Sequence, residues 1–198
     1  MKTNTIRKCL CLVSCCCISH NLLSVPQDTQ TIHLDKGSYQ VDYRPDLGIP
    51  SIVSWSVGRA DLGSIKRSSN LRFKTDKDTP KPRVTSALYT HSGYQRGHMC
   101  PSADRTSSKV AMKQTFIMSN VCPMTTNINT GSWKRVEEKE RQIAREKGQC
   151  YVIAASFFFP WDTAFIGGHR IAVPHAFFKI LYGKNPPEVY GMFLIENR

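Results

Sequence analysis

Long apolar segments are scarce in this sequence of 198 residues. One of them runs from Cys9 to Ile18 and is broken by Ser14. Because a helix needs about 20 apolar residues to cross a bilayer, this run is too short to span one. Internal repeats are also lacking, and no low-complexity tract occurs beyond the cysteine-rich start, which argues against a repeat architecture.

Acidic residues are few: 15 of them stand against 27 basic residues, and the formal net charge is +12. A surface this basic attracts polyanions, of which nucleic acid is the commonest large one. A basic protein without a charged partner remains the alternative at this point. Hydrophobic residues make up 40% of the chain and aromatic residues 10%, which is enough for the core of one globular domain.

Closely spaced cysteine pairs do not occur in the body of the chain, where the cysteines are Cys100, Cys122 and Cys150. A zinc module built from these and His98 therefore lacks the short ligand spacing of zinc hooks. If the chain is exported, two of the three cysteines could pair, and Cys100 with Cys122 is the expected pair. Three free thiols are an equal alternative.

The first 26 residues are typical of an export signal rather than of a fold. Lys2, Arg7 and Lys8 precede the apolar run, as in the charged start of a signal peptide. Within the run, Leu12-Val-Ser-Cys15 resembles the bacterial lipobox, so membrane attachment through a lipidated Cys15 is a further possibility. We therefore expect export from a bacterial cell (periplasmic, secreted or lipoprotein-anchored) and one domain over residues 27–198.

Strand-like and helix-like patterns do not alternate regularly along the chain, which favours an α+β fold with many strands around few helices. One helix is expected after Gly131, with its end at Gly148. The basic segment Ser64 to Arg83 is expected to be an exposed loop with a short strand. Strands are expected at 39–43, 52–57, 115–119, 150–159, 171–173, 176–182 and 190–195.

The stretch Tyr94 to Arg105 carries the most chemical information. It places Arg96 two residues before His98, with Gly97 between them to allow close approach of the backbone to another group. Cleavage of a phosphodiester needs a base for water and a cation for the phosphate. A histidine taken alone is more often structural than catalytic.

A second informative stretch runs from Ser119 to Arg141. Asn129 is expected at the start of the helix, and Glu137 and Arg141 lie one turn apart on it. One asparagine oxygen is enough protein ligation for Mg²⁺, because this ion keeps several waters and takes substrate phosphates as ligands. The alternative is that Asn129 caps the helix and that Glu137 and Arg141 form a surface pair.

Together the two stretches resemble the DNA/RNA non-specific endonucleases of the ββα-metal type. That family's signature is Asp-Arg-Gly-His, then Asn-x-x-Pro-Gln, then Asn-x-Gly-x-Trp with a glutamate four residues further. The corresponding residues here are Gln95-Arg-Gly-His98, Asn120-Val-Cys-Pro-Met124, and Asn129-Thr-Gly-Ser-Trp133 followed by Glu137. The resemblance covers roughly residues 39–195.

The resemblance implies a mainly antiparallel central sheet with flanking helices and a ββα-metal motif. It implies that His98 is the general base, held by a hydrogen bond from its other nitrogen. Asn129 would hold Mg²⁺, with Mn²⁺ as a substitute ion, and Glu137 would orient the waters of the metal. Arg96 and Arg141 would bind phosphate oxygens of DNA and RNA, which the family cleaves to 5′-phosphate products.

Three departures from the family pattern bear on activity. Gln95 replaces the usual aspartate, Met124 replaces a glutamine and is expected to loosen the loop leading to Asn129, and the sequence ends at Arg198, where many relatives continue. One alternative is therefore a catalytically weak or inactive nucleic-acid-binding protein of the same fold. Another is a phosphodiesterase that acts on smaller nucleotides.

Overall fold

The structure, a computed structural model, describes residues 31–159 and 163–198. Two α-helices occur there, α1 (Lys109–Gln114) and α2 (Trp133–Lys147). The strands are β1 (Ile32–Asp35), β2 (Gln40–Arg44), β3 (Ile49–Gly58), β4 (Gln95–His98), β5 (Val121–Met124), β6 (Gln149–Phe157), β7 (Phe165–Ile166), β8 (Ile171–Ala172), β9 (Ala176–Lys184) and β10 (Pro187–Glu196). The proposed signal, with Cys15, lies outside the described residues.

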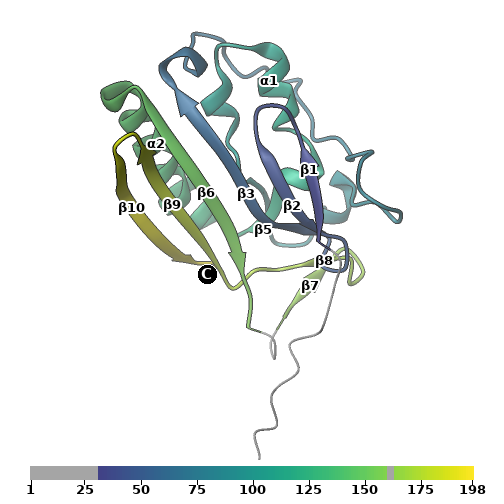
Figure 1. The fold of residues 1–198 in the computed structure, drawn as a ribbon. Helices are drawn as coiled ribbons and strands as arrows, with labels where there is room; N and C mark the ends of the chain where they lie inside the picture. Colours follow the sequence, from purple (N-terminus) through teal and green to yellow (C-terminus); the bar gives the residue numbers. More distant parts are fainter. Residues whose placement is uncertain (1–30, 160–162) are drawn as a thin grey trace, which may run out of the picture.

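Six strands form one antiparallel sheet in the order β1-β2-β3-β6-β9-β10 (Figure 1). Alternation in the sequence explains which face of each strand is buried. Tyr39, Val41 and Tyr43 are buried at the β2 end of the sheet, and Val152 and Ala154 are buried on β6. The α+β class and the antiparallel sheet predicted from the sequence are confirmed.

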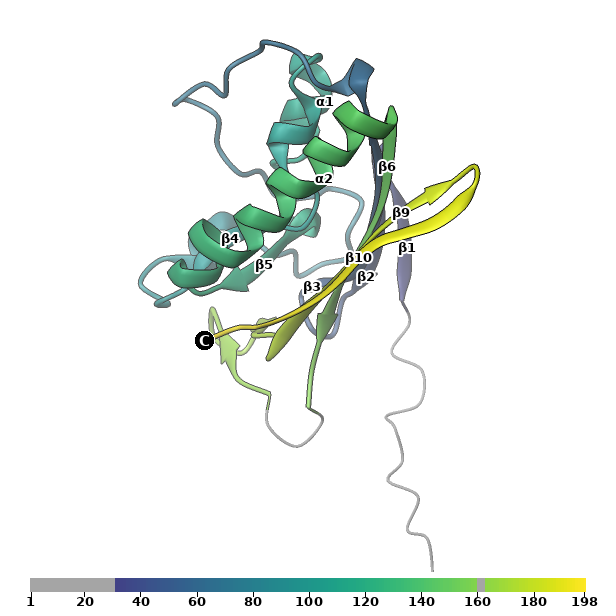
Figure 2. The same ribbon diagram turned by 90° about the vertical axis from the view of Figure 1, so that its left-hand side faces the viewer.

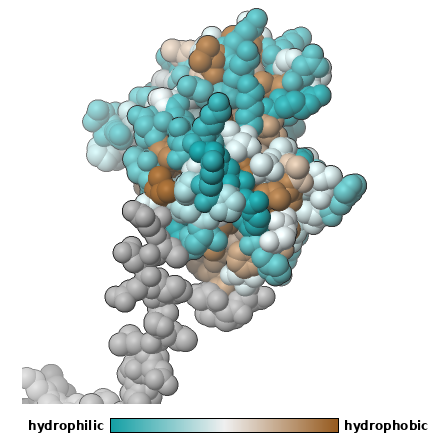
Figure 3. All heavy atoms as spheres, turned by 90° about the vertical axis from the view of Figure 1, so that its right-hand side faces the viewer, coloured by the Kyte–Doolittle hydropathy of each residue, from teal (hydrophilic) through white to brown (hydrophobic). Residues whose placement is uncertain are grey.

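The described helices lie on one side of this sheet, with α2 across β3 and β6 (Figure 2). Trp133, Val136, Ile143 and Ala144 form the buried stripe of α2, as the sequence predicted. Gly148 ends the helix with a φ of +93°, a left-handed conformation that glycine adopts without a steric penalty. Seen from the β1 edge of the sheet, the surface of the molecule is mainly hydrophilic, with apolar side chains in small separate patches (Figure 3).

The expected strand at Thr115–Ser119 is wrong. This segment links α1 to a short 3-10 helix, Met118–Asn120, and only Ile117 makes a bridge, with Lys74. Thr115 and Phe116 are consecutive and both buried, so the segment does not have the alternation of a half-buried strand. The short strand expected within residues 64–83 is reduced to the same single bridge.

The expected pairing of Cys100 with Cys122 is also wrong. Both are free and buried, as is Cys150. The Cys122 thiol instead contacts Ser156 Oγ at 3.4 Å, on strand β6 of the central sheet. Burial raises the pKa of Cys122 to about 12, so this thiol stays protonated at neutral pH. Among the described residues, no helix is long and apolar enough to cross a membrane.

Candidate active site

A two-stranded antiparallel sheet followed by a helix carries both sequence motifs. Strand β4 pairs with β5 in a register that places Gln95 opposite Met124 and His98 opposite Val121. A π-helical turn, Ile128–Ser132, leads directly into α2. The indole nitrogen of Trp133 donates a hydrogen bond of 3.0 Å to the carbonyl oxygen of His98, which fixes the start of α2 to the end of β4.

One groove of about 740 Å³ receives all five side chains predicted from the sequence. They come from β4 and α2 and from the π-helical turn between β5 and α2, so the ββα arrangement explains how distant motifs meet. The five residues are Arg96, His98, Asn129, Glu137 and Arg141. Arg67 and Lys134 add two more cations to the walls.

Gln95 fixes the orientation of Asn129. The Asn129 Nδ2 atom donates a hydrogen bond of 2.7 Å to Gln95 Oε1. Asn129 makes no side-chain capping bond to α2, so the alternative of a helix cap is not supported. Because Nδ2 is held by Gln95, Oδ1 is the atom left to act as a ligand, and within the described residues it accepts no hydrogen bond. Gln95, which stands where the family has aspartate, therefore orients the Asn129 side chain.

Aromatic rings hold the imidazole of His98. Its ring lies 4.8 Å from the Phe73 ring and 4.6 Å from the Phe116 ring, measured between centroids. Its Nε2 atom is inaccessible to solvent and has no hydrogen-bond partner among the described residues. Nε2 therefore lacks, among the described residues, the hydrogen bond that was expected to orient the imidazole. The contacts with the rings of Phe73 and Phe116 fix its orientation instead. Burial, with the nearby charge of Arg67, lowers the pKa of His98 to about 3.

Arg141 is positioned by a buried carboxylate that the sequence motifs did not reveal. Its Nη1 atom donates to Asp104 Oδ1 at 3.0 Å, and Asp104 also accepts a 2.9 Å bond from Trp55 Nε1. Asp104 is fully buried. The alternative of a surface pair between Glu137 and Arg141 is therefore not supported, because the Arg141 guanidinium pairs with Asp104. A charge-assisted bond to an immobile acceptor gives the Arg141 side chain one defined position.

A second buried ion pair lies beneath the same helix. Lys179 Nζ donates to Glu140 Oε2 at 3.1 Å, and neither side chain is exposed. The ammonium lies 4.0 Å from the centroid of the Trp133 ring, which is a cation–π contact. Burial raises the pKa of Glu140. Removing one partner would leave an uncompensated buried charge, so this pair fixes the position of α2 rather than adding much stability.

Glu137 faces the groove from α2, one turn before Arg141. Burial of its carboxyl group raises its pKa to about 7, although the charge of Lys179 acts in the opposite direction. A carboxyl group with such a pKa is only partly ionised at neutral pH. A cation bound in the groove would favour the ionised form.

Arg96 and Arg67 bring two positive charges to the lining of the groove. Arg96 donates from Nε to the carbonyl oxygen of Ser86 at 3.1 Å, and its guanidinium lies 5.6 Å from the centroid of the Tyr89 ring. Arg67 lies 4.7 Å from the centroid of the Phe116 ring. Among the described residues neither guanidinium forms an ion pair with a carboxylate, so both bring positive charge to the groove.

The loop at residues 64–83 is anchored rather than merely exposed. The backbone N–H of Lys74 donates to Phe116 at 2.8 Å, and that of Met118 donates to Lys74 at 2.9 Å. These bonds hold the segment that places Phe73 against the histidine, and Arg67 of the same loop lines the groove. In the sequence, only the run of basic residues indicated that this loop contributes to the groove.

Met124 does not loosen the segment that leads to Asn129. It is fully buried, and a Cβ atom on Gly97 would lie 2.3 Å from its sulfur. Gly97 is therefore required by the packing of a neighbouring side chain and not by the approach of a ligand. The expectation of a loosened segment is wrong, because the methionine fills the space between β4 and β5.

The described residues hold no group of three or more His, Cys, Asp or Glu side chains that could bind a metal ion. The zinc module considered from the sequence therefore has no ligand cluster in this part of the chain. An amide oxygen beside one carboxyl group suits a hard ion that retains most of its water, which is the behaviour of Mg²⁺. The residues of the groove fit such an ion.

The chain belongs to the DNA/RNA non-specific endonuclease family, because the model of that family matches residues 19–197. It is 35% identical to mitochondrial endonuclease G of Bos taurus over 156 residues, which are 74% of this chain and 52% of that protein. A nuclease of Nostoc sp. is 35% identical over 121 residues, covering 60% and 43% of the two chains. This chain therefore spans about half the length of these two relatives.

Nuclease C1 of Cunninghamella echinulata is 30% identical over 184 residues, which are 83% of this chain and 71% of that protein. Among solved structures, the crystal structure of an EndoG/EndoGI complex superposes with a TM-score of 0.77. The match covers 85% of this chain and 75% of that chain at 22% identity. At that identity the likeness concerns the fold, and it agrees with the arrangement described above.

Proposed function

We propose that this chain is a metal-dependent endonuclease that hydrolyses phosphodiester bonds of DNA and RNA with little regard to sequence. The observation that carries the proposal is the meeting of a histidine, an asparagine and two arginines in one groove of a family member. Binding through backbone phosphates explains the low sequence preference, since phosphates carry no sequence information directly.

In this proposal His98 takes a proton from the attacking water. Its low pKa keeps the imidazole neutral at physiological pH, and therefore able to accept a proton. An anionic phosphate entering the groove would raise that pKa again, because an opposite charge favours the protonated form. The leaving group is the 3′ oxygen, so the products carry 5′-phosphates.

Asn129 Oδ1 would hold a divalent cation, with Mg²⁺ as the expected ion and Mn²⁺ as a substitute. Such a cation would supply positive charge to the phosphorane and to the leaving oxygen. Glu137 accepts hydrogen bonds from water in the groove and so orients it. Arg96 and Arg141 hold phosphate oxygens, the latter in the position set by Asp104.

The test is degradation of plasmid DNA and of RNA with Mg²⁺, with a chelator, and by a His98→Ala variant. The matched control is His33→Ala, since His33 is an exposed histidine outside the groove. We expect cleavage only with metal and only with His98, and retained nucleic-acid binding by His98→Ala. Activity of a folded His98→Ala variant would contradict the assignment of the base. No cleavage by the folded parent chain would favour a binding protein of the same fold.

We also propose that the chain is exported, on the strength of the cations and the apolar run in its first 26 residues. Expression in a bacterial host, followed by fractionation and N-terminal sequencing, tests this. Protein that keeps its first residues in the cytoplasm would contradict it, and a mature chain beginning at a modified Cys15 would establish lipidation.

A further inference from the structure

A second cavity, of about 390 Å³, adjoins the catalytic groove, and Tyr94 lines both. The volume lies within the range of about 300–1,000 Å³ that is usual for small-ligand pockets. Its other walls are the end of β6, the end of β10 and the segment before β9. Phe157, Phe159, His175, Ala176 and Leu194 are among its lining residues.

The walls present aromatic and aliphatic surface to solvent. Phe157 is 46% exposed and Leu194 is 66% exposed, although both belong to strands of the central sheet. Phe157 and Phe159 pack edge to face with their ring centroids 5.3 Å apart, and the His175 ring lies 4.9 Å from Phe159. Apolar surface gathered in a concave site marks a place where a ligand binds.

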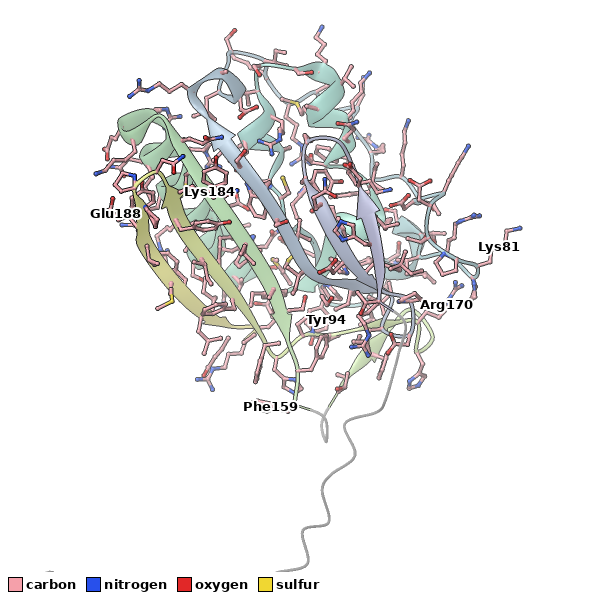
Figure 4. The ribbon with its side chains drawn as sticks, in the orientation of Figure 1. Lys81, Tyr94, Phe159, Arg170, Lys184 and Glu188 are labelled. Atoms are coloured by element: carbon pink, nitrogen blue, oxygen red, sulfur yellow. The ribbon has the colours of Figure 1, made fainter. Side chains whose placement is uncertain are left out.

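Tyr94 connects this pocket to the catalytic residues through the chain itself. It immediately precedes Gln95, which holds Asn129. Its backbone N–H donates to Ser92 Oγ at 3.2 Å, so the turn before β4 fixes its position. Tyr94 and Phe159 lie toward the same end of the sheet (Figure 4).

We infer that this pocket, the base pocket hereafter, binds an unpaired nucleobase of the substrate next to the scissile phosphate. The inference rests on the proposed nuclease function. Aromatic side chains stack on any base, because every base has a π-face, and such binding is tolerant of sequence. A base of a duplex cannot enter without unpairing and unstacking, which disfavours entry from double-stranded nucleic acid.

Polar groups of the lining are largely engaged within the protein. Glu196 and Arg198 form an ion pair with each other, and His175 Nδ1 accepts a hydrogen bond of 3.2 Å from the Phe159 N–H. The Asn197 side chain donates to the carbonyl oxygens of Pro123 and Pro174, and its Oδ1 accepts from the Thr125 N–H. That amide is therefore occupied by the backbone and is not available to a base. The base pocket consequently favours single-stranded nucleic acid without selecting a sequence.

The first experiment compares Phe157→Ala with Met192→Ala. Met192 is a suitable control because it is 65% exposed on β10 and does not line the base pocket. For Phe157→Ala we expect kcat/KM on single-stranded DNA to fall about tenfold, as removal of one stacking partner does, with less than about a twofold change on duplex plasmid. Phe157→Trp should restore the single-strand rate, since it restores an aromatic face. Equal losses on both substrates would overturn the inference.

The second experiment uses oligonucleotides with one abasic position on either side of the cleaved bond. On the parent chain, one of these positions should lower the rate about tenfold, and it should lower the rate of Phe157→Ala no further. Independent effects of the two changes would contradict the base pocket. Fluorescence anisotropy in the presence of a chelator measures binding without chemistry. A chain that binds single strands through Phe157 but cleaves nothing would refute the nuclease and leave the base pocket standing.

Discussion

The imidazole of His98 is neutral and enclosed in the folded chain, and this makes stability depend on pH. Its pKa is lowered from 6.5 to about 3, so the unfolded chain binds this proton more readily. The resulting contribution to stability is fully present above pH 6.5 and is lost as the pH falls toward 3. At pH 5 the loss is about 2 kcal/mol. We expect His98→Gln to remove this part of the acid sensitivity, as measured by urea unfolding at pH 7 and pH 5.

His33→Gln is the control for this measurement. Its pKa is raised, chiefly by the hydrogen bond with Asp42, so its contribution has the opposite sign and is lost as the pH rises through the folded value. The loss of stability between pH 7 and pH 5 should therefore persist in His33→Gln. If His98→Gln loses as much stability as the parent chain between pH 7 and pH 5, the enclosed neutral histidine is not the cause.

The side chain of Gln95 gives a second prediction for a single residue. Gln95→Ala removes the acceptor that orients Asn129. Partners of a metal ligand typically contribute about ten- to a hundredfold to metal affinity, so the Mg²⁺ concentration for half-maximal cleavage should rise by about that factor. Gln95→Asp keeps an acceptor and should retain most of the affinity. Gln142→Ala, on the exposed side of α2, is the control, and an unchanged Mg²⁺ requirement in Gln95→Ala would contradict the positioning role.

At the scale of elements, hydrogen bonds connect the end of β10 to β5, the strand that leads to the turn carrying Asn129. Asn197, which follows β10, bonds Pro123 and Thr125 on the β5 side and Pro174 before β9. Asn197→Ala would leave these partly buried backbone groups without partners, and we expect it to lower the free energy of unfolding by about 2–3 kcal/mol. Asn70→Ala, in an exposed loop, should change it little. Chemical denaturation measures both, and an unaffected Asn197→Ala would show that water replaces the amide.

Elements with a regular apolar period could be predicted from the sequence. The alternation of Tyr39, Val41 and Tyr43, the stripe along α2 and its end at Gly148 all correspond to observed elements. Thr115–Ser119 was mistaken for a strand because short apolar segments look alike whether a strand or a turn buries them. The alternation of apolar and polar residues identifies an element with one buried and one exposed face. It does not identify a segment in which consecutive residues are buried.

The site was predictable to the extent that its residues lie in local motifs. The five predicted side chains meet in one groove because β4, β5 and α2 form a single local unit. Asp104, Phe73 and Lys179 were missed, since their roles depend on contacts with residues such as Arg141, His98 and Glu140 that lie 25 to 39 positions away. No local pattern marks such a partner before the fold is known.

At the scale of the whole molecule, the net charge of +12 predicts how binding responds to salt. Arg67, Arg96, Lys134 and Arg141 line the groove, and each phosphate contact contributes about −0.9 to the slope of log affinity against log salt on duplex DNA. Four contacts give a slope of roughly −3.6, so affinity should fall roughly a hundredfold between 50 and 200 mM salt. Lys134→Ala should reduce the slope by about one, whereas Lys184→Ala, at the remote β9–β10 hairpin (Figure 4), should leave it unchanged. Anisotropy titrations with chelator measure these slopes, and a flat response in the parent chain would mean that the groove does not bind the phosphate backbone.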